Sequence, residues 1–545
     1  MTVEINEPVY ITGHCHPDTD SIASAIAYAF FRRARDGVKA VPCRLGEMNQ
    51  ETKYLLERFG YEPPILLKDA RKTLAEIELD SPEYITPEMS VLETIRRMHE
   101  LDRPSFAVLD EHQRIAGYIS KSDLANLALS DTASEIELLR QTDVYHMAEA
   151  IDGKVLLDDR ETHINGKVSL VAMSAEGTHN YDVKDRIVIV GNDAEAQIDL
   201  IEKGAGLLII VWAKQVEERV LACAREHHCP ILLSGHGSMN TSRYLFLSPP
   251  VRLLMREPIA FRDTDFAEEA ARRMMKSRLR CYPVIDADNR LVGYMHRYHI
   301  MNYHNKRIIL VDHNEFSQSV KAIEKAQILE VIDHHRINDF ATSQPVAFRN
   351  EIVGSTATLI TTMFRENQIP IPPALAGLLL GAVLSDTLNF QSPTTTEKDR
   401  SVGNLLAALA GLELDVFARE MFENAVAKDE AIPNLIIKDI KYFDIESFHT
   451  MISQILVGRV ADIRGSETDI QRRMDELTAK KNLDLLVVAF TSVIDNGSVL
   501  FFAGEKASAA AEAFPDLPNE THSVQEGILS RKGQILPKIQ AALGS

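Results

Sequence analysis

The sequence contains little cysteine and no long apolar run. Five cysteines are spread over 545 residues without metal-type pairing, and such an odd, sparse set is typical of a reducing compartment. We therefore expect five unpaired thiols: Cys15, Cys43, Cys223, Cys229 and Cys281. No apolar run approaches the ~20 residues that span a bilayer. The first residues also lack the basic flank and apolar core of a signal peptide, which predicts a cytoplasmic protein without a membrane partner.

Positive charge is also scarce. The 59 lysines and arginines face 79 aspartates and glutamates, which leaves a formal net charge of -20. Proteins that bind nucleic acid usually present a basic face, so this balance argues against a nucleic acid as partner. It allows a small anionic substrate if metal ions or a few placed cations offset the field locally. The length exceeds the usual size of one hydrophobic core and predicts several domains.

The first chemically informative stretch is 13–21, Gly-His-Cys-His-Pro-Asp-Thr-Asp-Ser. It lies between an apolar run at 9–11, which predicts a buried strand, and an Ala-rich segment at 22–35, which predicts a helix. Open α/β sheets place their ligands in such strand-to-helix loops. Imidazole and carboxylate together favour Mn, Co, Fe or Zn, and Asp18 and Asp20 can point to different ions. The alternative is an ordinary helix N-terminus, with one of the residues after Asp18 as its N-cap.

Three more polar clusters follow apolar segments downstream. Residues 307–311 and 328–332 predict strands that end in Asp312-His313-Asn314-Glu315 and Asp333-His334-His335-Arg336, with a helix expected between them at 317–325. An apolar helix at 375–383 leads to Ser385-Asp386-Thr387. Parallel strands of one sheet would bring the strand-end clusters to the same edge as 13–21. Because buried carboxylates must be paired or coordinate a metal, we expect a dinuclear metal site at this edge.

The C-terminal region, 431–545, carries a few placed cations. Its pattern predicts strands at 452–457, 485–490 and 499–502 and a helix at 467–480. Near its end stands Ser530-Arg531-Lys532-Gly533-Gln534, and Lys441 lies near its start. Guanidinium and ammonium groups together can neutralise a small anion that carries several negative charges. The alternative is a basic helix turn that meets the helix dipole.

Together these motifs closely resemble the DHH phosphoesterase superfamily and, within it, the family II inorganic pyrophosphatases. The resemblance covers 1–70 and 307–545. It implies an α/β fold: a doubly wound, mainly parallel sheet in a catalytic domain made of 1–70 and 307–430, then an α/β substrate-binding lobe at 431–545. It implies that one ion is held by His14, Asp18 and Asp312, and the other by Asp20, Asp312, His334 and Asp386. The groups that would face the substrate are His335, Lys441, Arg531 and Lys532, while His16 and His313 lie outside the ligand set.

The resemblance implies hydrolysis of pyrophosphate to two phosphates by a metal-activated water, with two Mn²⁺ or Co²⁺ ions in the protein and Mg²⁺ on the substrate. One alternative is another DHH phosphoesterase that acts on oligonucleotides, cyclic dinucleotides or 3'-phosphonucleotides. Those relatives typically end in a Gly-Gly-Gly-His-type loop, whereas this terminal lobe carries the stretch 530–534. The other alternative is a nucleotide sensor without catalysis.

A repeated unit separates the two parts of the catalytic domain. Segments 71–130 and 251–306 each run helix, strand, turn, strand, which indicates a duplicated unit that buries its apolar face against its copy. Both copies resemble the CBS motif, which works in pairs and binds adenine nucleotides. The first copy keeps the family's ending as Gly117, Ser120 and Asp123. The second has His296 and His299 there instead, and its candidate phosphate and base contacts are Arg280, Tyr282 and Arg297.

The CBS resemblance implies regulation by AMP, ADP, ATP or diadenosine polyphosphates. The alternative is a CBS pair that only holds subunits together. Between the copies, 131–250 resembles the DRTGG domain in its βαβαβ layout, although the residues that give the domain its name are absent. We expect a structural or dimerising role for this segment, and a homodimer or a dimer of dimers for the protein.

Overall fold

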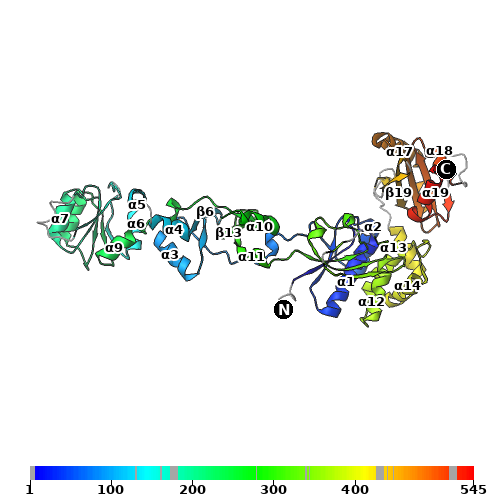
Figure 1. Cartoon of the computed structure of the whole chain (residues 1–545), viewed down its shortest axis with the longest axis horizontal. Helices are drawn as coiled ribbons and strands as arrows, with labels where there is room; N and C mark the ends of the chain where they lie inside the picture. The colour runs from blue at the N-terminus through cyan, green and yellow to red at the C-terminus, as the bar shows by residue number, and fades with distance from the viewer. Residues whose placement is uncertain are drawn as a thin grey trace. The chain divides into compact units, whose positions relative to one another are not determined.

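The computed structural model describes residues 7–128, 132–159, 162–171, 182–277, 279–337, 341–342, 344–424, 435–437, 440–445, 447–514 and 524–544. The chain forms two compact units (Figure 1). The first unit consists of residues 1–71 and 304–545, and the insert unit consists of residues 72–303. The insert unit therefore interrupts the first unit once along the chain.

The first unit is built around a six-stranded sheet in the order β17-β16-β15-β1-β2-β3, with all neighbouring pairs parallel. Its strands are β1 (Val9–Thr12), β2 (Ala40–Arg44), β3 (Ile65–Leu66), β15 (Arg307–Val311), β16 (Gln327–Asp333) and β17 (Ala347–Asn350). β1 pairs with β2 on one side and with β15, from beyond the insert unit, on the other. The strand order reverses between β1 and β15, which is the place where open α/β sheets bind their ligands.

Two helices, α1 (Thr19–Asp36) and α12 (Thr356–Glu366), pack directly against this sheet. Four more pack mainly on these two and on one another: α2 (Gln50–Phe59), α13 (Pro373–Asp386), α14 (Glu397–Ala410) and α15 (Leu414–Asn424). α13 is buried from Leu375 to Leu384, as expected for a helix that is apolar on all sides. Among the described residues no single helix is long and apolar enough to cross a membrane. The helices α14 and α15 taken together are long and apolar enough, by length and composition only, but they are bent by 91° at the break between them.

The prediction of a helix at 317–325 is wrong. The segment contains two short 3₁₀ turns, Phe316–Gln318 and Ile323–Lys325. Ala322 between them has a left-handed backbone (φ 59°), which ends any α-helix at that point. Two carbonyls that a helix would need are used elsewhere: those of Gln318 and Lys321 accept hydrogen bonds from the amides of Cys15 (2.7 Å) and Ala70 (2.9 Å). Long-range hydrogen bonds thus replace local ones here.

The C-terminal part of the first unit has its own sheet, in the order β18-β19-β20-β21-β22. Its strands are β18 (Ile440–Ile445), β19 (Phe448–Leu456), β20 (Leu485–Ser492), β21 (Gly497–Ala503) and β22 (Val524–Glu526), and β19 with β20 is its parallel pair. Every residue of β20 is buried because apolar clusters cover both faces of the sheet. The helices are α17 (Glu467–Lys481), α18 (Ala507–Glu512) and α19 (Leu536–Leu543), with a π-helical turn at Arg531–Ile535 before α19.

The insert unit contains two small sheets of identical design, β4-β5-β6 and β12-β13-β14. The strands are β4 (Tyr84–Ile85), β5 (Ser105–Leu109), β6 (Ile115–Ser120), β12 (Phe261–Arg262), β13 (Cys281–Ile285) and β14 (Leu291–His296). Each sheet has a parallel pair, then an antiparallel pair. The accompanying helices are α3 (Val91–Glu100), α4 (Lys121–Ala128), α10 (Ala267–Met275) and α11 (Arg297–Asn302).

The two small sheets meet through tyrosine hydroxyls. Tyr294 of β14 accepts a hydrogen bond from the amide of Ala107 (2.8 Å), and Tyr118 of β6 donates one to the carbonyl of Cys281 (3.1 Å). Burial raises the pKa of both tyrosines above its usual value, so the hydroxyls stay neutral. The repeat seen in the sequence therefore forms a pair that buries one copy against the other.

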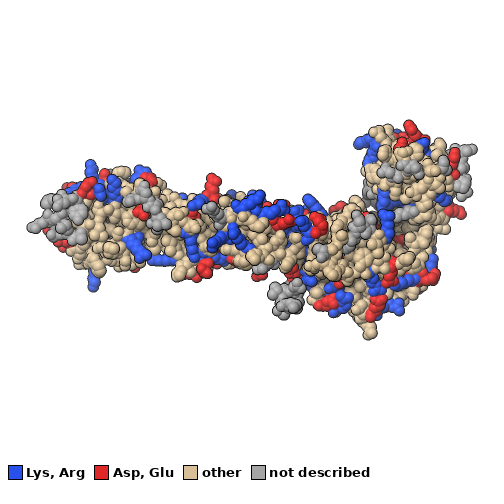
Figure 2. Space-filling view, viewed as in Figure 1, with Lys and Arg blue, Asp and Glu red and all other residues tan. Residues whose placement is uncertain are grey.

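A third sheet of the insert unit, in the order β7-β11-β10-β9-β8, lies between the two copies in sequence. β8 (Val168–Val171), β9 (Ile187–Val190), β10 (Leu207–Ile210) and β11 (Ile231–Leu233) are parallel, and β7 (Lys154–Leu157) is an antiparallel edge strand. Its neighbours in sequence are α5 (Thr132–Arg140), α6 (Val144–Ala150), α7 (Ala194–Glu202), α8 (Glu218–Glu226) and α9 (Ser238–Leu245). On the face that Figure 2 shows, basic and acidic side chains are interspersed over both units.

All five cysteines are free thiols, which confirms that expectation. Burial raises the pKa of Cys43 and Cys229 to about 12 and that of Cys281 to about 11. These three thiols are therefore protonated and unreactive at neutral pH, because the thiolate is the reactive form.

Candidate metal centre

The structure brings all six predicted ligand residues together at the carboxyl ends of β1, β15 and β16 and the end of α13. Two groups of donor atoms form there, each with all its atoms within 4.8 Å of one another. One group is His14, Asp18 and Asp312, and the other is Asp20, Asp312, His334 and Asp386. Asp312 belongs to both groups. The six side chains come from four separate segments of the chain, which only the parallel sheet brings to one edge.

His14 lies between two carboxylates. Its Nε2 is 3.2 Å from Asp18 and 3.5 Å from Asp312. Burial is the largest single influence and lowers the pKa of His14, but the charge of Asp18, the hydrogen bond to Asp18 and the charge of Asp20 together raise the pKa overall. The reverse holds for Asp18, whose pKa is lowered by His14 against the effect of burial. Asp18 is also the N-cap of α1, because its side chain accepts a hydrogen bond from the Ser21 amide at 3.0 Å.

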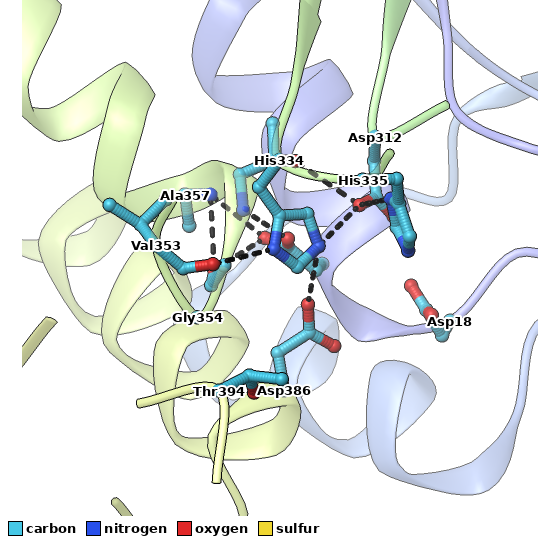
Figure 3. Close-up of polar contacts among 12 residues, drawn as sticks. Asp18, Asp312, His334, His335, Val353, Gly354, Ala357, Asp386 and Thr394 are labelled. Carbon is cyan, nitrogen blue, oxygen red and sulfur yellow. Dashed lines mark hydrogen bonds and ion pairs between the residues drawn. The ribbon is translucent and has the colours of Figure 1, made fainter. Parts of the chain in front are cut away.

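His334 lies between the second pair of carboxylates (Figure 3). Its Nε2 is 3.6 Å from Asp312 and 3.5 Å from Asp386. Its Nδ1 is 3.0 Å from the carbonyl of Val353, so Nδ1 carries a proton and Nε2 is the nitrogen that can bind a metal ion. The lone pair of Nε2 then points at the carboxylates, and this buried atom has no hydrogen-bond partner. Such an atom is suited to bind a cation.

Asp312 is fully buried and has a left-handed backbone (φ 61°). Ser21 and Thr356 donate hydrogen bonds to its two carboxylate oxygens at 2.6 and 3.1 Å. Burial, together with the charges of Asp20 and Asp18, raises its pKa well above the usual range. The pKa of Asp386 is raised by burial in the same way. Several clustered carboxylates that repel one another need cations to be ionised together, so the donor set fits two divalent metal ions.

Asp20 is oriented by the N-terminus of α12, which the sequence reasoning missed. Its carboxylate accepts hydrogen bonds from the amides of Thr356 (2.6 Å) and Ala357 (3.0 Å) and from the Ser355 hydroxyl (3.0 Å). A helix N-terminus stabilises a carboxylate through its free amides and its dipole. The Gly-Ser-Thr sequence before α12 was a detectable capping signal, but nothing local indicated its partner.

His335 is partly exposed beside the same carboxylates. Its Nδ1 is 2.9 Å from Asp333 and 3.8 Å from Asp312. It forms a third close donor group with Asp312 and His334, so the structure allows either a substrate-facing or a ligating role for His335. His313 is buried with its Nδ1 3.0 Å from the Val311 carbonyl, whereas His16 is exposed.

The predicted substrate cations lie in the C-terminal part of the first unit. Lys441 is an exposed residue of β18, and its charge acts on His14, where it partly opposes the carboxylates. Arg531 is 7% exposed, and its guanidinium donates to the carbonyl of Ile452 at 3.4 Å. The side chain of Lys532 lies outside the described residues.

One of the predicted nucleotide residues of the first CBS-like copy, Asp123, lines a cavity. Ser120 donates to Asp123 through its hydroxyl (2.7 Å) and its amide (3.0 Å), and Arg256 forms an ion pair with Asp123. A cavity of about 660 Å³ beside these residues is lined by Asp123, Arg256, Ser134, Glu137 and Gln141. Gly117 faces Met255, whose sulfur lies 2.4 Å from where a Cβ would be, so a larger residue would require the Met255 side chain to shift.

The corresponding residues of the second copy make internal contacts. Asp80 lies 3.1 Å from His296 and 3.7 Å from His299, and it also binds Arg103 (3.2 Å). Tyr282 is buried against Phe261, with ring centroids 5.0 Å apart. Arg280 is exposed, and Arg297 donates to the Ser277 carbonyl at 2.8 Å.

The fold and the site define an α/β protein built around a two-metal centre. The model of the DHH family N-terminal domain matches residues 8–383, and that of the DHHA2 domain matches residues 420–542. The chain belongs to the DHH family and, within it, to the family II inorganic pyrophosphatases.

Two relatives and one solved structure illustrate the similarity. A cobalt-dependent inorganic pyrophosphatase of Clostridium perfringens is 33% identical over 539 residues, which is 98% of each chain. A manganese-dependent inorganic pyrophosphatase of Bacillus subtilis is 36% identical over 237 residues, which is 43% of this chain and 77% of that one. The solved CBS and DRTGG domains of the Clostridium perfringens enzyme, complexed with its activator diadenosine tetraphosphate, cover 41% of this chain and 99% of their own at 25% identity, with a TM-score of 0.38.

Proposed function

We propose that the protein is a manganese- or cobalt-dependent inorganic pyrophosphatase that hydrolyses diphosphate to two phosphates. The observation that carries the proposal is the convergence of six donor side chains into two groups that share Asp312. The full-length relative named a cobalt-dependent inorganic pyrophosphatase and the shorter manganese-dependent one support the same activity and the same metals.

The first group of ligands would be His14, Asp18 and Asp312, and the second Asp20, Asp312, His334 and Asp386. When bound, two such ions would lower the pKa of a water ligand and polarise the phosphoryl group, and Mg²⁺ would accompany the substrate. The chain fixes the donors in place before any ion arrives: the Val353 carbonyl sets the tautomer of His334, and the N-terminus of α12 orients Asp20.

The remaining residues would bind and orient the substrate. Pyrophosphate carries up to four negative charges. The Arg531 guanidinium would bind it through two parallel N–H groups, and the ammonium groups of Lys532 and Lys441 would add two positive charges. His335 is held through Nδ1 by Asp333, which leaves its Nε2 to meet the substrate. It is our candidate to donate a proton to the leaving phosphate.

A substrate comparison tests the activity. Phosphate release from pyrophosphate and from a short oligonucleotide is measured at equal Mn²⁺ concentration with the full chain. Rapid release from pyrophosphate alone is expected. Release from the oligonucleotide at a similar rate would favour another DHH phosphoesterase, and release from neither would favour a nucleotide sensor.

We also propose that adenine nucleotides regulate this activity through the insert unit, in a homodimer or a dimer of dimers. The cavity beside Asp123 offers a carboxylate for a ribose hydroxyl and Arg256 for phosphate. In the second copy, His296 and His299 stand where the first copy has Ser120 and Asp123. It therefore has no carboxylate at that place for a ribose hydroxyl, and both histidines contact Asp80. A ligand regulates only if it binds two states of the protein unequally, so AMP, ADP, ATP and diadenosine polyphosphates can differ in sign.

Asp123→Ala tests the regulatory site. It removes a charged acceptor, which should weaken AMP binding by about 10- to 100-fold while the basal hydrolysis rate stays unchanged. The matched variant of the second copy, His299→Ala, should retain AMP binding. Equal AMP affinity in Asp123→Ala and the wild type, measured by calorimetric titration, would contradict the assignment.

A further inference from the structure

One buried acid near the metal centre belongs to neither donor group. Glu51 lies in the first turn of α2 and is 3% exposed. Its Oε2 has no hydrogen-bond partner, and burial raises its pKa. A carboxyl group in such a position is costly, so it needs a compensating role.

Glu51 connects the two segments that carry the most widely separated ligands. Its Oε1 accepts a hydrogen bond from the Thr19 hydroxyl and another from the Ser385 hydroxyl, both at 2.5 Å. Thr19 lies between Asp18 and Asp20 at the start of α1, and Ser385 directly precedes Asp386 at the end of α13. One oxygen atom therefore ties together two helix ends that are more than 360 residues apart along the chain.

Thr19 is placed from the α2 side by a second contact. Its hydroxyl is 3.1 Å from that of Thr52, the neighbour of Glu51. Thr19, Glu51 and Thr52 are all buried, so water cannot replace a lost partner. Loss of the acceptor would leave the buried Thr19 hydroxyl with Thr52 alone and would remove the contact of the partly buried Ser385 hydroxyl, so the end of α13 could move relative to α1.

We propose that Glu51 is a positioning residue that fixes the spacing of Asp20 and Asp386 and so sets the affinity for the metal ion these carboxylates share. The inference rests on the proposed function for its metal, and it adds a residue that orients ligands without touching the ion. Groups that orient metal ligands typically contribute about 10- to 100-fold to metal affinity.

Direct binding of Mn²⁺ to the metal-stripped full chain tests this inference. Free Mn²⁺ is followed by electron paramagnetic resonance during titration, which counts the bound ions and their affinities. In Glu51→Ala one of two ions should bind about 10- to 100-fold more weakly, and the other should change little. Glu51→Gln keeps a carbonyl oxygen at the Oε1 position and should bind within about threefold of the wild type.

Tyr54→Phe is the matched control. It removes another hydrogen bond of α2, the one from Tyr54 to Glu420 of α15 (2.6 Å), which does not face the metal centre. Its Mn²⁺ affinities should equal those of the wild type. If Glu51→Ala does not fold, Ser385→Ala removes one arm of the same contact with little loss of volume and should weaken the same ion.

Two results would overturn the inference: unchanged Mn²⁺ binding in Glu51→Ala or Ser385→Ala, or equal weakening in Glu51→Gln and Glu51→Ala, which would indicate a charge effect. Hydrolysis of pyrophosphate by the wild type is measured separately. Absence of hydrolysis together with the expected Mn²⁺ shifts would reject the proposed function and leave the role of Glu51 standing.

Discussion

Strands β1 and β9 lead into the same local design in the two units. Each is an interior parallel strand followed by a glycine and then by an aspartate that caps a helix: Gly13 and Asp18 precede α1, and Gly191 and Asp193 precede α7. Each aspartate accepts a hydrogen bond from an amide of its helix, at 3.0 Å for Asp18 and 2.9 Å for Asp193. Only the first of these loops belongs to a cluster of metal donors in the described chain.

The difference lies in loop length and in the neighbouring strands. Residues 14–17 separate Gly13 from Asp18, whereas only residue 192 separates Gly191 from Asp193. The longer loop supplies His14, and the adjacent strands β15 and β16 also end in acids and imidazoles. A parallel sheet thus provides an edge, but a site needs several strand ends with matching chemistry.

Among substitutions that test this comparison, Asp312→Asn should have the largest effect on activity. The change removes the charge shared by both donor groups, and asparagine tolerates the left-handed backbone at this position. We expect the rate of pyrophosphate hydrolysis to fall by about 100-fold or more. The melting temperature of the insert unit should not change. Asp193→Asn, the control in the other sheet, should keep full activity. Substantial hydrolysis by Asp312→Asn would remove the basis of the proposed catalyst.

Asp18→Asn should separate the two roles of one side chain. Asparagine caps helices as well as aspartate does, so stability should change little. The loss of charge beside His14 should nevertheless weaken Mn²⁺ binding by about 10-fold or more. Asp193→Asn should change neither property. Equilibrium dialysis of Mn²⁺ together with calorimetry measures both, and unaltered Mn²⁺ affinity in Asp18→Asn would assign this residue to capping alone.

Gly13→Ala should destabilise the protein more than Gly191→Ala does. A Cβ at Gly13 would lie 2.5 Å from the Cβ of Ser21, which donates to Asp312, whereas a Cβ at Gly191 would meet nothing within 4 Å. We expect Gly13→Ala to cost about 1–3 kcal/mol and to lower metal affinity. Gly191→Ala should stay within about 0.5 kcal/mol of the wild type. Chemical denaturation checks the pair, and equal stabilities would contradict the crowding at Gly13.

The smallest effect on the metal centre should come from Asp193→Ala. Loss of an N-cap costs about 0.5–2 kcal/mol, here in the insert unit only. Its melting transition should shift down slightly while Mn²⁺ binding and hydrolysis persist. A loss of hydrolysis would show that this loop does more than cap α7.

The sequence predicted those parts of the site that lie at strand ends. Asp312 and His334 were expected to meet because parallel strands expose their carboxyl ends at one edge. Glu51 and the N-terminus of α12 were not predicted, because their contacts with Thr19 and Asp20 form only when distant helices pack. The wrong helix at 317–325 has the same origin, since amides from distant segments bind its carbonyls.

The pairing of β1 with β15 also governs when the first unit can form during translation. About 300 residues must be made after β1 before β15 exists, and at about 5–20 residues per second this takes roughly 15–60 s. The insert unit is complete by then, while β1 still has an unpaired edge of the kind that promotes aggregation. A nascent chain that pauses inside the insert would therefore depend on chaperones to keep its first strands soluble.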